Sequence, residues 1–164
     1  MPTFSFDIVS EYDKAEMNNV FAQVEKEIDN RYDFKGSPAS IEWLGDKKGF
    51  KLVGASQWQV EAVLDIVRKK LVSRNQTSKS LDLTTDPVES NLKTTWEIPF
   101  IAGLDQDKAK KITALLSEKV PKVKALIQGD AVRVTSGSKD DLQSAMREVD
   151  AADFEFSTQY TNYR

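Results

Sequence analysis

The stretch MNNVFAQVEKEI (17–28) has the same apolar spacing as VEAVLDIVRKKL (60–71), 43 residues further along the chain. In each stretch, apolar residues occupy the first, fourth, fifth, eighth and twelfth positions, which is the spacing of one face of an α-helix. A capping-box pattern precedes each, with Asp13 before Glu16 and Ser56 before Gln59. The repeat predicts two amphipathic helices in equivalent places of one fold.

Alternating apolar and polar residues around these helices predict strands. One strand is expected near 3–10, before the first helix, and a hairpin is expected over 41–52, between the helices. Leu81 and Leu83 predict a further strand. The polar stretch TTDPVESNLKT (84–94) contains one Pro and is typical of a linker or loop.

The same order of elements then begins again. Alternation over 96–100 predicts a strand, and Asp105 is placed to cap a helix. A hairpin is expected over 123–134. A third capping box, at 138–141, precedes another helix, and Phe154 is expected to start the last strand.

The pattern therefore predicts an α+β protein made of two tandem βαββαβ units, residues 1–90 and 91–164. Each unit is expected to be ferredoxin-like, with a four-stranded antiparallel sheet and two helices on one face of it. The other face of such a sheet is free to bind RNA, a ligand or another sheet.

The composition argues against an enzyme, because the 164 residues include no His and no Cys. Ser-His-Asp and Cys-His mechanisms are excluded, as are zinc sites built from imidazole or thiolate. Catalysis would need a carboxylate–metal site, and the candidate ligands are Asp29, Asp33, Asp105 and Asp107. Carboxylates at helix ends are more often caps or dipole partners, so we expect neither metal nor catalysis.

The sequence gives no sign of a membrane segment. No apolar run approaches the roughly 18 residues that a membrane-spanning helix needs. The first residues, MPTFSFDIVSEYD, alternate apolar with polar and lack the layout of a signal peptide. We expect a cytoplasmic protein with no membrane partner.

Positive charge is concentrated in residues 108–139, which hold eight Lys and Arg against two acidic residues, in a chain of net charge −3. This basic segment could contact phosphates, which would make binding salt-dependent. It could equally be a solvated surface flanked by acidic neighbours. Both interpretations stay open from sequence alone.

Aromatic residues give a weaker signal. Trp43, Trp58 and Trp96 could stack on bases or pack in the core, and Phe34-Lys35-Gly36 could bind a nucleotide or end a helix. Neither of the two glycine-rich phosphate-binding patterns, GxxxxGK[ST] and GxGxxG, occurs. Nucleotide hydrolysis by the P-loop route is therefore not expected.

Six segments carry a resemblance to a known family: SFDIVSE (5–11), RYDFKG (31–36), AKKI (109–112), KVKALIQGDAVRVT (122–135), KDDLQ (139–143) and NYR (162–164). With them, in this order, the chain resembles the YajQ family of small bacterial nucleotide-binding proteins. The resemblance implies two tandem ferredoxin-like units that exchange their first strands. Residues near 3–10 would then join the second unit, and residues near 94–101 the first.

The resemblance also implies function: binding of a purine nucleotide (GTP, ATP or cyclic di-GMP) or tRNA, with a transcription regulator as a protein partner in some members, and no cofactor or enzymatic activity. The candidate nucleotide contacts at matching positions are Lys35, Lys110, Lys111, Gln128, Arg133, Lys139 and Gln143. Arg133 is favoured because a guanidinium can bind phosphate or guanine bidentately.

One departure and one alternative accompany this prediction. The strongly basic stretch usual in the family before DDLQ is here Ser136-Gly137-Ser138-Lys139, with fewer cations. The alternative function is a protein-interaction adaptor that docks through an open sheet face and has no small-molecule ligand.

Overall fold

The computed structural model describes residues 3–164, which form two compact units. The split unit combines the residues up to Glu11 with Ala102–Arg164, and the central unit is Tyr12–Ile101. The split unit contains β1 (Phe4–Val9), α3 (Gln106–Lys119), β6 (Lys124–Gln128), β7 (Ala131–Ser136), α4 (Lys139–Ala152) and β8 (Gln159–Thr161). The central unit contains α1 (Lys14–Asn30), the 3-10 helix η1 (Tyr32–Phe34), β2 (Ser40–Leu44), β3 (Gly49–Gly54), α2 (Gln57–Ser73), the 3-10 helix η2 (Ser78–Ser80), β4 (Val88–Ser90) and β5 (Lys93–Pro99).

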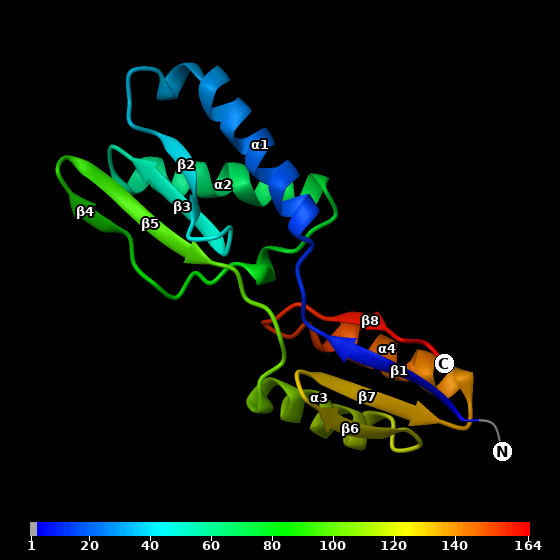
Figure 1. Ribbon diagram of the computed structural model, residues 1–164. Coiled ribbons are helices and arrows are strands. Elements are labelled where there is room, and N and C mark those ends of the chain that lie inside the picture. The colour runs from blue at the N-terminus through cyan, green and yellow to red at the C-terminus, as the bar shows by residue number, and fades with distance from the viewer. Residues whose placement is uncertain (1–2) are drawn as a thin grey trace. The chain divides into compact units, whose positions relative to one another are not determined.

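Each unit is a four-stranded antiparallel sheet with two helices on one face (Figure 1). The strand order is β6-β7-β1-β8 in the split unit and β2-β3-β5-β4 in the central unit. In both, the strand that fills the first position of the ferredoxin-like layout lies in the interior of the sheet. The predicted α+β fold of two ferredoxin-like units is confirmed.

The first strands are exchanged between the units. In Figure 1 the blue strand β1 lies between β7 and β8, and Ile8 pairs with Val132 on one side and Tyr160 on the other. The strand β5 takes the corresponding place between β3 and β4. The exchange implied by the family resemblance is therefore present. The predicted halves 1–90 and 91–164 describe the order of the elements along the chain. The compact units differ from these halves, because β1 of the first half belongs to the split unit and β5 of the second half belongs to the central unit.

Burial explains why β1 belongs to the split unit. Phe6 and Ile8 are fully buried in a core with Val132 and Val134 of β7 and with Ile112 of α3. The core of the central unit is separate, and its members include apolar residues of α1 and α2 that the helical repeat singled out: Met17, Val20, Val24, Ile28, Val60, Val63, Leu64, Val67 and Leu71. Both helices of this pair thus bury the face that their sequence pattern predicts.

The predicted helix caps are formed in part. The Asp13 carboxylate accepts a hydrogen bond from the Glu16 amide, and the Ser56 hydroxyl accepts one from the Gln59 amide. The third box is wrong, because the Ser138 side chain makes no capping hydrogen bond. The Ser136 hydroxyl accepts from the Ser138 amide instead, and donates to the Asp141 carboxylate at 3.1 Å.

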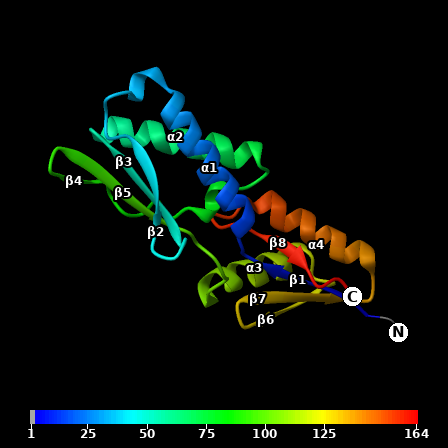
Figure 2. The same ribbon diagram turned by 45° about the horizontal axis from the view of Figure 1, so that its top comes forward.

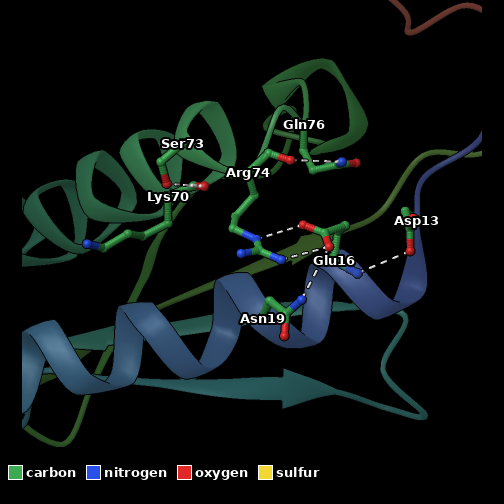
Figure 3. A network of polar contacts seen from close by, with 7 residues as sticks. All are labelled: Asp13, Glu16, Asn19, Lys70, Ser73, Arg74 and Gln76. Carbon is green, nitrogen blue, oxygen red and sulfur yellow. Dashed lines mark hydrogen bonds and ion pairs between the residues drawn. The ribbon is translucent and has the colours of Figure 1, made fainter.

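The Glu16 side chain joins the two helices of the central unit rather than completing its capping box (Figure 3). Its carboxylate accepts from Arg74 Nε at 2.7 Å and Nη2 at 2.9 Å, and from Asn19 Nδ2 at 3.3 Å. The Arg74 guanidinium lowers the pKa of Glu16. The Arg74–Glu16 contact thereby ties the start of α1 to the end of α2. Figure 2 shows the ribbons of these two helices from a second direction.

Two edge strands lie elsewhere than predicted. Leu81 forms only an isolated bridge to Phe100, and the fourth strand of the central sheet is β4, inside the polar stretch predicted as a linker. The expected strand at Phe154 is also wrong: Phe156 packs into the core, and β8 begins at Gln159. Short strands of three residues carry too little alternation to be recognised in a sequence.

The turn between β4 and β5 makes a prediction about stability. Asn91 and Leu92 both have positive φ, and Leu92 is 97% exposed. A side chain in this left-handed conformation is disfavoured by roughly 1–2 kcal/mol, and hairpin turns of this kind favour Gly at the second position. We expect Leu92→Gly to raise the free energy of unfolding by about 1 kcal/mol in urea titrations, net of the extra entropy of Gly in the unfolded chain.

Leu92→Ala is the control, because it shortens the side chain and keeps the unfavourable conformation. It should leave stability nearly unchanged. A Leu92→Gly variant no more stable than Leu92→Ala would show that the backbone at this position is not strained.

Candidate functional site

A hollow of about 420 Å³ lies in the split unit, beside the N-terminal half of α4. We call it the α4 pocket. Its lining residues come from three segments that are distant in sequence: Phe4, Ser5, Lys139, Leu142, Gln143, Met146, Tyr163 and Arg164. The volume lies in the range of roughly 300–1,000 Å³ found for small-molecule sites.

Helix geometry places the four α4 residues on one side of the helix. Lys139, Leu142, Gln143 and Met146 follow the spacing i, i+3, i+4, i+7, which brings side chains to one face. Leu142 is buried and Gln143 is exposed. The helix therefore contributes an apolar floor, an amide and an ammonium group to the same hollow.

The last residues are held against β1 by a local irregularity. Asp7 pairs with Thr161, yet Ser5 exchanges both backbone hydrogen bonds with Arg164, at 3.1 and 3.0 Å. One extra residue therefore lies between these pairs, and Asn162 has a positive φ of 53°. This bulge places the Tyr163 ring at the edge of the pocket, with its centroid 6.4 Å from the centroid of the Phe6 ring.

The pocket combines flat apolar groups with cations. Phe4 is half-buried and Tyr163 is 65% exposed, so both rings offer surface to a ligand. The Lys139 ammonium lies 5.0 Å from the centroid of the Phe4 ring, a cation–π distance. Arg164 adds a guanidinium. Such a site suits a ligand with a planar ring and a negative charge.

Arg133, the favoured sequence candidate, lies elsewhere and has a partner. It projects from β7 on the helix-free face of the sheet, where its Nε donates to Asp7 Oδ1 at 2.9 Å and its Nη2 to Oδ2 at 3.4 Å. Asn162 Nδ2 donates to the same carboxylate at 2.8 Å. The Arg133 guanidinium holds the pKa of Asp7 below its usual range, so this cation is largely neutralised.

This ion pair leads to a prediction about stability and pH. The Asp7 side chain is 9% exposed, and hydrogen bonds to charged groups contribute about 1.5–3 kcal/mol. We expect Asp7→Asn to lower the free energy of unfolding by about this amount at pH 7, measured in urea. Because the folded-state pKa is lowered, the difference is fully present above the unfolded value of about 3.9 and is lost as the pH falls through the folded-state pKa.

Glu42→Gln provides the matched control. Glu42 is exposed and lies 3.9 Å from Lys51 Nζ, so its loss should change stability little at any pH. If Asp7→Asn lowered stability at pH 7 no more than Glu42→Gln does, the contacts of Asp7 with Arg133 and Asn162 would contribute no more to stability than an exposed ion pair.

The other sequence candidates are dispersed. Lys110 and Lys111 are exposed on α3, in the helix layer, and Lys111 Nζ pairs with Glu155 at 3.0 Å. Gln128 is exposed at the end of β6, on the helix-free face with Arg133. Lys35 is exposed in the central unit. The structure brings together only Lys139 and Gln143 within a hollow.

Sequence reasoning missed the apolar and C-terminal parts of the α4 pocket: Phe4, Ser5, Leu142, Met146, Tyr163 and Arg164. Their grouping depends on the strand exchange and on the bulge, and neither leaves a periodic pattern. One feature of the sequence could have indicated two of these residues. The segment NYR (162–164) is among those that carry the family resemblance, and it contributes Tyr163 and Arg164 to the pocket.

The structure shows where the four aromatic residues considered in the sequence lie. Phe34 is buried, with the Arg31 guanidinium 4.5 Å from its ring centroid. Trp43 packs against the core of the central unit, as does Trp96, whose Nε1 donates to the Thr85 carbonyl at 2.8 Å. Trp58 is 72% exposed.

Two of the four carboxylates considered for a metal have other partners. Asp105 accepts from the Lys108 amide at the start of α3, and Asp33 pairs with Arg31 at 2.7 Å. Within residues 3–164 there is no group of three or more acidic side chains that could hold a metal ion. No helix in that range is long and apolar enough to cross a membrane.

Two ferredoxin-like units with exchanged first strands define the structural class of this chain as a tandem α+β protein. Residues 4–164 match the family described as nucleotide-binding protein YajQ-like, and the chain belongs to this family. The resemblance noted in the sequence is thus confirmed.

Relatives match over the whole chain. A protein of Nocardioides sp. is 41% identical and one of Streptomyces griseus 42% identical, each over 100% of both chains. A protein of Trichodesmium erythraeum is 41% identical over 99% of this chain and 98% of its own. All three are named nucleotide-binding proteins.

Proposed function

We propose that this chain is a non-catalytic nucleotide-binding protein and that the α4 pocket holds a purine nucleotide. The observation that carries the proposal is the convergence of two aromatic rings, an amide and two cations on one hollow of about 420 Å³. The names of the full-length relatives support the same ligand class.

The chemistry of the lining assigns a role to each part of the ligand. A purine ring would lie along Phe4 and Tyr163, since base–aromatic stacking contributes about 1–3 kcal/mol. The Gln143 amide can both donate to and accept from a base edge. The phosphates would pair with Lys139 and Arg164 at the rim.

The same lining supports binding without catalysis. The chain contains no His and no Cys, and the residues that line the pocket include no Asp or Glu. Ser5, the one hydroxyl of serine or threonine there, therefore has no carboxylate or imidazole in the lining to act as its general base. A bound nucleotide is expected to be released unchanged.

Size helps to rank the ligands expected from the family. A mononucleotide such as GTP or ATP has one base for the hollow, whereas cyclic di-GMP has two and would place only one of them there. A tRNA would need an unstacked base to enter. A mononucleotide is therefore the best match, and binding of a transcription regulator remains a separate prediction.

Calorimetric titration of the full chain with GTP, ATP, cyclic di-GMP and bulk tRNA, at low and moderate salt, tests the proposal. We expect saturable binding of a purine mononucleotide that persists at the higher salt. Binding of tRNA alone, with a steep loss in salt, would overturn the pocket as the site and favour the exposed basic residues. No binding of any of the four would overturn nucleotide binding and favour the adaptor function.

A further inference from the structure

A second hollow, of about 290 Å³, lies in the central unit between the start of α1 and the turn that joins β2 to β3. We call it the hairpin pocket. It is lined by Tyr12, Lys14, Met17, Asn18, Trp43, Asp46, Lys47 and Lys48. None of these residues belongs to the split unit, so this hollow is distinct from the α4 pocket.

The indole of Trp43 forms a fixed aromatic wall. The Phe21 ring stacks on it with centroids 4.5 Å apart and planes 13° from parallel, and the Phe50 ring lies 5.3 Å away. The Lys47 ammonium lies over the indole at 5.2 Å from its centroid. Phe21 does not line the hollow whereas Trp43 and Lys47 do, so the place of the Lys47 ammonium over the indole is one that a planar ligand could take over.

The hairpin pocket carries a net positive charge that no carboxylate pairs with in the described residues. Its lining has three ammonium groups, from Lys14, Lys47 and Lys48, against the single carboxylate of Asp46. Besides the indole, Lys47 Nζ contacts a neutral acceptor, Asn18 Oδ1, at 3.0 Å. Within residues 3–164 no ion pair joins these three lysines to a carboxylate, in contrast to Lys111 and Arg133.

The backbone at Lys47 adds an independent observation. Lys47 has φ of 59°, a left-handed conformation that Gly or Asn adopts at lower cost. Strained residues of this kind concentrate at functional sites. A lysine at this position makes the turn less stable than Gly or Asn would, and it places an ammonium group over the Trp43 indole.

We infer that the hairpin pocket is a second ligand site, for a small organic phosphate that carries a planar ring, such as a nucleoside monophosphate. The ring takes the place over the Trp43 indole where the Lys47 ammonium lies. The displaced Lys47 and its neighbour Lys48 pair with the phosphate, and the Asn18 amide is free to bind a polar edge of the ligand. This site goes beyond the proposed function, which concerns the α4 pocket alone.

Tryptophan fluorescence tests the inference, because all three tryptophans lie in the central unit and only Trp43 lines the pocket. The full chain is titrated with GMP and excited at the red edge of indole absorption. We expect a saturable change in emission that Trp43→Phe abolishes, although Trp58 and Trp96 still emit. Guanosine and inorganic phosphate should each bind more weakly than GMP.

Charge variants supply matched controls. Lys47→Asn should weaken GMP binding about tenfold or more, since a charged hydrogen bond contributes about 1.5–3 kcal/mol, and Asn tolerates the left-handed backbone. Lys93→Gln removes one positive charge outside the hairpin pocket. Pro99, at one end of β5, pairs with Gly49 beside the pocket, and Lys93 lies six residues away at the other end of the strand. This control should bind GMP as the unmodified chain does.

The inference would be overturned by no change in emission up to millimolar GMP, by a change that survives Trp43→Phe, or by equal weakening in Lys47→Asn and Lys93→Gln. The titration is repeated with Lys139→Gln, a variant of the α4 pocket. An unaltered fluorescence response there supports a separate hairpin site even if the α4 pocket proves empty. Loss of the response would assign it to the α4 pocket and contradict the second site.

Discussion

The segment Tyr12–Ile101, produced alone, is expected to fold cooperatively, whereas the linear second half, residues 91–164, is expected to stay unfolded. The first segment contains every helix and strand of the central unit and all residues of its core. The second lacks β1, with its fully buried Phe6 and Ile8. Truncation of one such side chain costs about 2–5 kcal/mol, and total stabilities are only about 5–15 kcal/mol.

Circular dichroism and urea unfolding of the two segments measure this difference. A peptide of residues 3–11, added to the segment Ala102–Arg164, should restore a cooperative transition, because β1 pairs with β7 and β8 there. The matched control is the same peptide with Phe6→Ser and Ile8→Ser, which should not. Independent folding of 91–164 without the peptide would contradict the strand exchange.

The second large effect concerns ligand affinity. The double variant Lys139→Gln, Arg164→Gln is expected to bind GTP about 100-fold more weakly, as each charged hydrogen bond contributes about 1.5–3 kcal/mol and 1.4 kcal/mol is a factor of ten. Calorimetry at one fixed salt concentration gives the two dissociation constants. The effect is expected in affinity and not in stability, because both side chains are exposed.

Lys110→Gln, Lys111→Gln removes the same charge from α3, outside the α4 pocket. Its affinity for GTP should stay within a few-fold of the unmodified chain. Equal losses in the two double variants would point to general electrostatic attraction by the basic segment and against a defined pocket.

The helices were predictable because each is amphipathic and buries the face marked by its spacing, as Met17, Val20 and Val24 do in α1. The partners of the strands were not predictable from the pattern. Alternation at Phe4, Phe6 and Ile8 indicates which side chains share a face, but not which strands lie alongside. The exchange of β1 and β5 came from the family resemblance alone.

The candidate site was predictable only in part for similar reasons. Lys139 and Gln143 lie one helical turn apart on α4, so their shared face follows from the helix. Tyr163 reaches the same pocket through a bulge at Asn162, which depends on tertiary pairing. The ion pair that neutralises Arg133 involves Asp7, which is 126 positions away and adjacent only after the strand exchange.

The most direct test of the central claim, that the α4 pocket binds a purine nucleotide, is a titration of the isotope-labelled full chain with GTP, followed by amide NMR shifts. The account predicts saturable shifts at Phe4 and Ser5, across 139–146 and at 163–164. Shifts confined to α3 and the helix-free sheet face around Arg133, or no shifts at millimolar GTP, would contradict it.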